Sequence, residues 1–162
     1  MKTEAERIAE QLRRAYEGPA WHGPDLSWLL EGLTAEQAAA RPVEGVRSIW
    51  ELVNHIIAWQ DAPRRRLAGD PADLSEEEDF PPVSDTSEEA WGAALAKLRE
   101  SNEALRAEVL CFGDERLDEP VVEKGSSAYV TLHGSVHHTL YHAGQIAVIK
   151  RALGLPPVTK RR

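Results

Sequence analysis

The chain has 162 residues, 42% of them hydrophobic and 28% charged, a composition that is ordinary for a soluble globular protein and argues against disorder. A formal net charge of -8 without a broad basic stripe argues against nucleic acid as a partner, because phosphate binding needs clustered Lys and Arg. The single cysteine, Cys111, excludes an internal disulfide framework and suits a reducing compartment.

The first predicted helix covers about residues 4–16. Its apolar residues recur at the four- and three-residue intervals of a helix with one buried face: Ile8, Leu12 and Ala15. Gly18 and Pro19 should end this helix. A short helical turn is then predicted from Pro24, with apolar contacts from Leu26, Leu29, Leu30 and Leu33. Residues 34–37 resemble a further helix cap before a brief turn.

A second long helix is predicted to begin after Ser48. Ser48 and Glu51 have the spacing of a capping box, in which each side chain accepts a backbone N–H of the other residue. A buried face follows, made of Ile49, Leu52, Val53, Ile56 and Trp59. Pro63 removes one backbone donor and should bend or end the helix, with Leu67 and Gly69 as its latest end.

Residues 70–85 are predicted to form an acidic surface loop. They contain three prolines and the acidic cluster Glu76–Asp79, and this composition cannot supply the apolar stripe of a core helix. The cluster can attract a cation weakly, but a solvated run of charge is the far commoner explanation. We therefore assign this loop no function from the sequence.

Two further long helices are predicted in the second half of the chain. Thr86 and Glu89 form another capping-box pair, before an apolar face of Trp91, Leu95, Leu98, Asn102, Leu105 and Val109. An irregular stretch follows in which Val121–Glu123 can pair as one strand of a small hairpin. Thr131 is a suitable cap for a last helix that ends near Leu153.

These elements predict an all-α protein, a single domain over residues 1–162. Four helices with one apolar face each can close around a common core, so we expect a four-helix bundle, most simply connected in an up-and-down order. A minor hairpin before the last helix would not change this class. No segment approaches the roughly 18 apolar residues of a membrane span, and residues 1–7 do not resemble a secretory signal. We therefore expect a cytoplasmic protein without membrane contact.

Histidines are the residues most suggestive of chemistry. The last helix contains four of them: His133, His137, His138 and His142. The i, i+4 spacing of His138 and His142 places both imidazoles on one helix face, within reach of one ion, although so many histidines can produce this spacing by chance. His55 lies beside Ile56, near the face expected in the core, where a lone histidine is more often a hydrogen-bonded core residue. If His55 faces the pair of His138 and His142 in the folded protein, it becomes the third candidate ligand.

Three motifs in the sequence resemble the DinB-like superfamily, which includes YfiT-like proteins described as metal-dependent hydrolases. The motifs are Ala20–Pro24 after the first helix, Ser48–Ile56 at the start of the second, and His138–Ile146 in the last. The resemblance covers nearly the whole chain. It implies a four-helix bundle that binds a metal through one histidine of the second helix and two of the last, a pattern that falls on the three candidate ligands.

A three-histidine site implies one divalent ion of zinc, nickel or iron, with coordination positions left for water or substrate. A second metal is not expected, because the sequence lacks the Glu-x-x-His pairs of di-metal bundles. The ion would lower the pKa of a bound water or thiol toward neutrality. The resemblance thus implies a metal-dependent hydrolase, or a transferase of a small thiol such as bacillithiol, mycothiol or glutathione. The catalytic residues cannot be named, since no general base is evident.

Five further residues are candidates for the surroundings of the metal: Trp21, His22, Glu51, Trp59 and Gln145. Glu51 lies one turn before His55, and Gln145 one turn after His142, so either can orient an imidazole or a bound water. The capping role of Glu51 competes with this one. Trp59 also fits a plain core position, and His22 can simply cap the turn before Gly23.

Two other functions stay open. The protein can be a non-enzymatic metal-binding or stress-response protein in which the ion is structural or sensory, or the histidines can be structural in a dimerising scaffold. A solvent-connected site would favour an enzyme, whereas a site sealed under Trp59 would not. A homodimer is expected under every one of these hypotheses, because leftover apolar helix faces often pair with a second copy.

Overall fold

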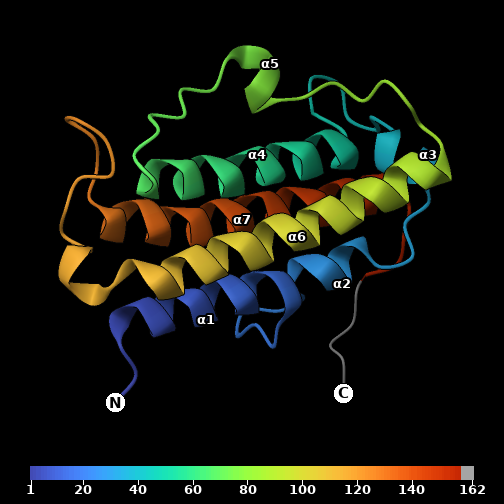
Figure 1. Cartoon of the computed structure of the whole chain (residues 1–162). Helices are drawn as coiled ribbons and strands as arrows, with labels where there is room; N and C mark the ends of the chain where they lie inside the picture. Colours follow the sequence, from blue (N-terminus) through green and yellow to red (C-terminus); the bar gives the residue numbers. More distant parts are fainter. Residues whose placement is uncertain (158–162) are drawn as a thin grey trace.

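A computed structural model describes residues 1–157 as an all-helical bundle, which confirms the predicted fold class (Figure 1). The long helices are α1 (Glu4–Glu17), α4 (Ile49–Leu67), α6 (Glu88–Phe112) and α7 (Ala128–Ala152). Shorter elements occupy the connections: α2 (Leu26–Leu30), α3 (Ala35–Ala39), α5 (Glu76–Asp79) and the 3₁₀ turn η1 (Asp114–Arg116). Within residues 1–157, no helix is both long and apolar enough to cross a lipid bilayer.

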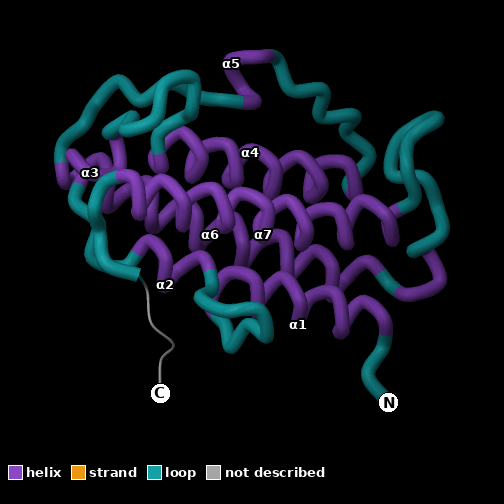
Figure 2. The backbone as a smooth tube through the Cα atoms, turned by 180° about the vertical axis from the view of Figure 1, so that it is seen from behind, coloured by secondary structure: helices purple, strands orange, loops and turns teal. Residues whose placement is uncertain are grey.

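The hairpin predicted at Val121–Glu123 is wrong, and no strand is found in the described part of the chain (Figure 2). Pro120 and Ser127 form only an isolated antiparallel bridge. The residues between them close a tight turn, in which the Gly125 N–H donates to the carbonyl of Val122 at 2.9 Å. The bridge consists of two hydrogen bonds, from the Val121 N–H to the Ser126 carbonyl at 3.1 Å and from the Ala128 N–H to the Glu119 carbonyl at 2.8 Å.

The order of the long helices is up, down, down, up, which corrects the up-and-down expectation. α1 and α7 run one way along the bundle, and α4 and α6 run the other (Figure 1). α4 packs against α6 and α7, and α1 packs against the same two helices, so α1 and α4 lie diagonally. The end of α4 and the start of α6 lie at opposite ends of the bundle, so residues 68–87 must cross its length. This crossover carries α5 over α4 (Figures 1 and 2).

Side-chain caps set the starts of the helices, and the predicted capping box of Ser48 and Glu51 is confirmed at α4. Pro63 lies inside α4 without ending it. Two predicted caps are wrong by a few residues. The cap of α6 is Ser87 rather than Thr86, and that of α7 is Ser127 rather than Thr131. The earlier start of α7 adds Ala128, which is fully buried, to the apolar face.

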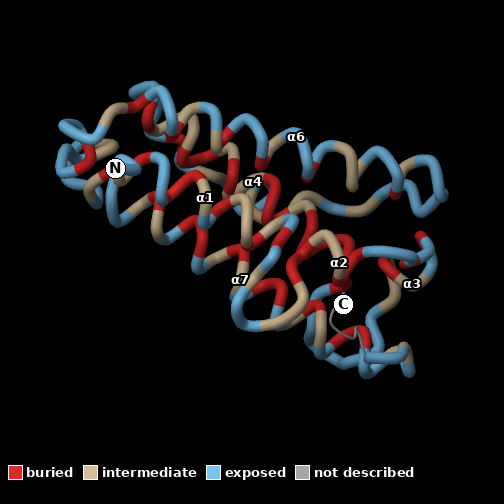
Figure 3. The backbone as a smooth tube through the Cα atoms, turned by 90° about the horizontal axis from the view of Figure 1, so that it is seen from below, coloured by how far each residue is buried: buried red, intermediate tan, exposed pale blue. Residues whose placement is uncertain are grey.

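The core consists of two apolar clusters separated by a polar layer. Buried segments alternate with exposed ones along the helices (Figure 3). One cluster surrounds Trp50 and Trp91, and the other surrounds α1. Between them, each of the helices α4, α6 and α7 contributes one buried polar residue: Gln60, Asn102 and Thr139. Both polar side-chain atoms of Asn102 lack a hydrogen-bond partner among the described residues. On α7 this layer adjoins the histidines, so the middle of the bundle is where polar chemistry can be buried.

Candidate metal centre

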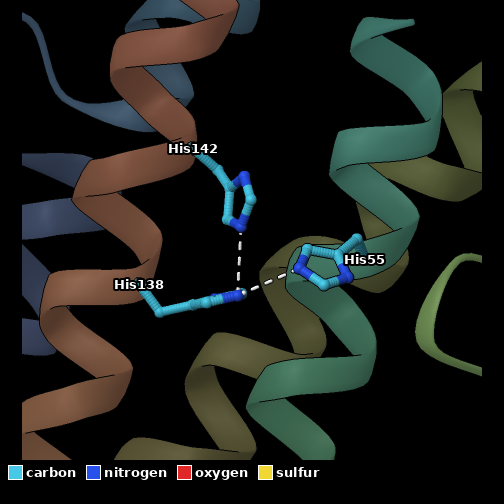
Figure 4. Close-up of side chains that lie close together, drawn as sticks. All are labelled: His55, His138 and His142. Atoms are coloured by element: carbon cyan, nitrogen blue, oxygen red, sulfur yellow. Dashed lines mark hydrogen bonds between the residues drawn. The ribbon is translucent and has the colours of Figure 1, made fainter. Parts of the chain in front are cut away.

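Three histidines from two neighbouring helices converge at one point. His55 comes from α4, and His138 and His142 come from α7, which packs against α4. The Nε2 atom of His138 lies 3.0 Å from Nε2 of His55 and 3.1 Å from Nε2 of His142 (Figure 4). A candidate ligand atom from each ring lies within 4.8 Å of the other two, an arrangement that can hold a metal ion.

The partners on the outer side of two rings fix their tautomers. Nδ1 of His55 faces only acceptors, the Asp79 carbonyl oxygen at 2.7 Å and the Asp79 Oδ1 at 3.1 Å. Nδ1 of His142 faces the Gln145 Oε1 at 2.6 Å. We therefore assign the proton to Nδ1 in both rings, which leaves a bare lone pair on each Nε2. Both lone pairs point at the Nε2 of His138, which can donate a proton to only one of them at a time.

The protonation states suit a cation. Burial, together with the nearby His142 and His55, lowers the pKa of His138 to about 4. Burial also lowers the pKa of His142, although its hydrogen bond with Gln145 acts in the opposite direction. His138 and His142 are therefore neutral at pH 7, as metal ligands must be. Tetrahedral zinc with nitrogen ligands at about 2.0–2.1 Å requires nitrogen atoms about 3.3 Å apart, close to the two spacings found.

The acidic loop covers this site, a role that the sequence analysis did not assign to it. Residues 75–80, which we term the strap, contain α5, capped by Ser75 and Glu78, and then Phe80. The Phe80 ring stacks on the His55 imidazole with centroids 4.0 Å apart and planes 3° apart. The sequence signal that could have identified the strap was the capping-box pair Ser75 and Glu78, followed by the aromatic residue Phe80. What the sequence could not show is the position of the strap over α4 (Figure 1).

Two of the five predicted pocket residues lie at the site. Gln145 forms a hydrogen bond with Nδ1 of His142. Trp59 is partly buried, and its ring centroid lies 5.6 Å from that of His138 and 6.3 Å from that of His55. Trp59 thus borders the imidazoles on the side of α4, and Gln145 borders them on the side of α7.

The structure does not bring Trp21 or His22 to the histidines. Both are exposed on the connection between α1 and α2, which lies on the opposite side of the bundle from α5 (Figures 1 and 2). His133 and His137 do not join the site either. His137 is exposed, and His133 lies beside Tyr129 with centroids 4.4 Å apart.

Glu51 is occupied at the start of α4. Its carboxylate accepts the Ser48 N–H and hydrogen bonds from Arg41 at 2.6 Å and Arg47 at 3.0 Å. Burial alone would raise the pKa of Glu51, but these hydrogen bonds outweigh it and hold the pKa below its usual value. Glu51 therefore serves the helix cap and its ion pairs, and the structure gives it no contact with His55.

A helical bundle with three convergent imidazoles, two of them buried and that of His138 partly buried, defines a class of protein with a candidate mononuclear metal centre. The family model described as the DinB superfamily matches residues 20–146, a span that includes all three histidines and the strap. The chain therefore belongs to the DinB superfamily, and the resemblance seen in the sequence motifs is confirmed. No curated protein matches the chain.

Proposed function

We propose that this protein binds one divalent transition-metal ion, zinc, nickel or iron, through His55, His138 and His142. The observation that carries the proposal is the convergence of three Nε2 atoms, two of them with lone pairs fixed by outer partners. When bound, the ion would act as a Lewis acid that lowers the pKa of a coordinated water or thiol toward neutrality. Three protein ligands leave coordination positions for such a group.

The proposed activity is hydrolysis of a small molecule, or transfer of a low-molecular-weight thiol to one. The residues of the chain would bind and orient in this reaction. Gln145 orients His142, and Asp79 orients His55. Phe80 covers one face of His55 and keeps water from it. The Asp79 carboxylate already accepts hydrogen from Trp59, so we assign it an orienting role rather than that of a general base.

A non-enzymatic metal-binding or stress-response role is the second candidate, and the burial of the site favours it. His55 and His142 are each only 6% exposed, and the strap lies over the first of them. A groove of about 480 Å³ lies between α4 and α6, but none of the three histidines lines it. A sensory or structural ion needs no substrate channel, so this geometry suits it.

Metal analysis of the purified protein, followed by thermal unfolding, tests these proposals. We expect one ion per chain and a higher Tm for the metal-loaded form than for the metal-free form. Absence of retained metal, with no change of Tm on adding zinc, nickel or iron, would reject metal binding. A screen of thiols and small amides then separates the two roles. A compound that raises the Tm of the metal-loaded form alone indicates an enzyme, whereas no such compound favours the sensory or structural role.

We also propose that two copies of the chain pair through the outer face of α7. Val130, Tyr141 and Val148 are more than half exposed, and at about 100° per residue they share one face of the helix. Residues 128–149 contain no Asp, Glu, Lys or Arg, so two chains of net charge -8 can approach here with the least repulsion. Light scattering should give a dimer mass that falls to the monomer mass for Val130→Glu/Val148→Glu. A monomeric unmodified protein would refute the pairing.

A further inference from the structure

The carboxylate of Asp79 is held between two residues of α4. We infer that Asp79 is a positioning residue, which fixes the tautomer and orientation of His55 so that its Nε2 lone pair faces the other two imidazoles. This inference rests on the proposed metal site and adds the strap to it. It gives part of the acidic loop a function beyond that of a solvated run of charge.

Two residues of α4 contact the same carboxylate oxygen of Asp79. Nδ1 of His55 lies 3.1 Å from Oδ1, and the Nε1–H of Trp59, one helical turn further on, donates to Oδ1 at 2.5 Å. The backbone carbonyl of Asp79 also accepts from His55 at 2.7 Å. The hydrogen bond from Trp59 holds the Asp79 carboxylate in place without help from His55. Asp79 can therefore determine the orientation of the His55 imidazole.

Neighbouring contacts fix the end of the strap, and the residue that follows it, to α4. After Asp79, the Phe80 ring stacks flat on His55, and the guanidinium of Arg47 lies over the Phe80 ring at 4.6 Å from its centroid. The carbonyl of Pro81 accepts from the Asn54 side chain at 3.3 Å. Stacking on one face and a hydrogen bond at Nδ1 together prevent the His55 ring from turning over. The lone pair on Nε2 is therefore pre-oriented before any ion arrives.

A carboxylate in this position also strengthens the ligand. The hydrogen bond of the His55 Nδ1 goes to the Asp79 carbonyl oxygen at 2.7 Å, and the carboxylate adds a contact of Oδ1 at 3.1 Å. An outer carboxylate of this kind favours positive charge on the imidazole and its ion, and loss of such a partner typically weakens metal binding about 10- to 100-fold. The remaining acidic residues of the strap are exposed and have no such contact with a histidine in the described structure. The effect should therefore be specific to Asp79 and not to the charge of the loop.

The test compares Asp79→Asn with Glu77→Gln, which removes one charge from the same helical turn at an exposed position. Zinc affinity, measured by competition with a chromogenic chelator, should fall about 10- to 100-fold for Asp79→Asn and by less than about twofold for Glu77→Gln. Binding should weaken rather than disappear, because the backbone carbonyl of Asp79 remains. Trp59→Phe should weaken binding less, and combining it with Asp79→Asn should add little, since both act through one carboxylate.

A second measurement needs neither zinc nor a variant. Nitrogen-15 NMR of the metal-free protein should show the proton of His55 on Nδ1. A proton on Nε2, or equal zinc affinities of Asp79→Asn and Glu77→Gln, would overturn the positioning role. The two proposals fail separately. If the unmodified protein binds no zinc, the metal site is refuted while the tautomer of His55 still tests Asp79. If it binds zinc and Asp79→Asn changes nothing, only the positioning role is refuted.

Discussion

Replacing His55, His138 or His142 by alanine should weaken zinc binding by more than about 100-fold, because even outer-partner losses reach about that size. The Nε2 atom of His138 lies within 3.1 Å of the Nε2 atoms of both other histidines, so its loss removes the central ligand. Elemental analysis after dialysis should then find far less than one ion per chain. The increase in Tm on adding zinc should also disappear.

His137→Ala is the matched control for these variants. His137 is adjacent to His138 on the same helix, but it is exposed and outside the cluster. This variant should keep one ion per chain. The Tm of each metal-free variant separates loss of metal from loss of fold. Stoichiometric metal in all three single variants would refute the assignment of the ligands.

Trp91→Ala should lower the free energy of unfolding by about 3–5 kcal/mol, the range for removing a buried aromatic side chain. Trp91 is 2% exposed and packs against Trp50 with ring centroids 5.0 Å apart. Its Nε1–H also donates to the Leu33 carbonyl at 2.9 Å, which ties α6 to the segment between α2 and α3. Alanine would leave both a cavity and an unpaired carbonyl. Urea unfolding followed by circular dichroism measures the change.

The control for this prediction is Trp21→Ala, since Trp21 is 96% exposed. Its effect should stay within about 0.5 kcal/mol, as for most surface substitutions. Equal losses of stability in the two variants would mean that the Trp50–Trp91 contact does not hold that end of the core together.

The sequence predicts the helices well because their signals are local. Apolar periodicity and cap spacing depend on neighbouring residues, so the Ser48 cap of α4 could be read directly. Where two caps compete, tertiary burial decides. Ser127 and Thr131 are both suitable caps, and α7 starts at the first because Ala128 then enters the core. The sequence alone does not show which of the two caps starts the helix.

The site was only partly predictable for the same reason. The i, i+4 spacing of His138 and His142 is a local signal. His55 was a candidate from its place near the buried face of its helix, and the family resemblance supported it. Periodicity defines which face of a helix is apolar but not which way the helix runs, so it could not give the up, down, down, up order. The contact of Asp79 with His55 depends on that order, because only a crossover along the bundle brings residues 68–87 over α4.

The crossover has more chain than its path requires. α4 has 19 residues and is about 28 Å long at 1.5 Å per residue, a distance that about nine extended residues can span. Residues 68–87 provide 20 residues, so roughly half of them are not needed to join the two helices. Apart from its contacts with α4 and the packing of Ala72, Phe80 and Val83 against the core, the length and composition of this surplus are free to vary. Redesign of the surplus can therefore change the approach to the histidines while the four helices keep their packing.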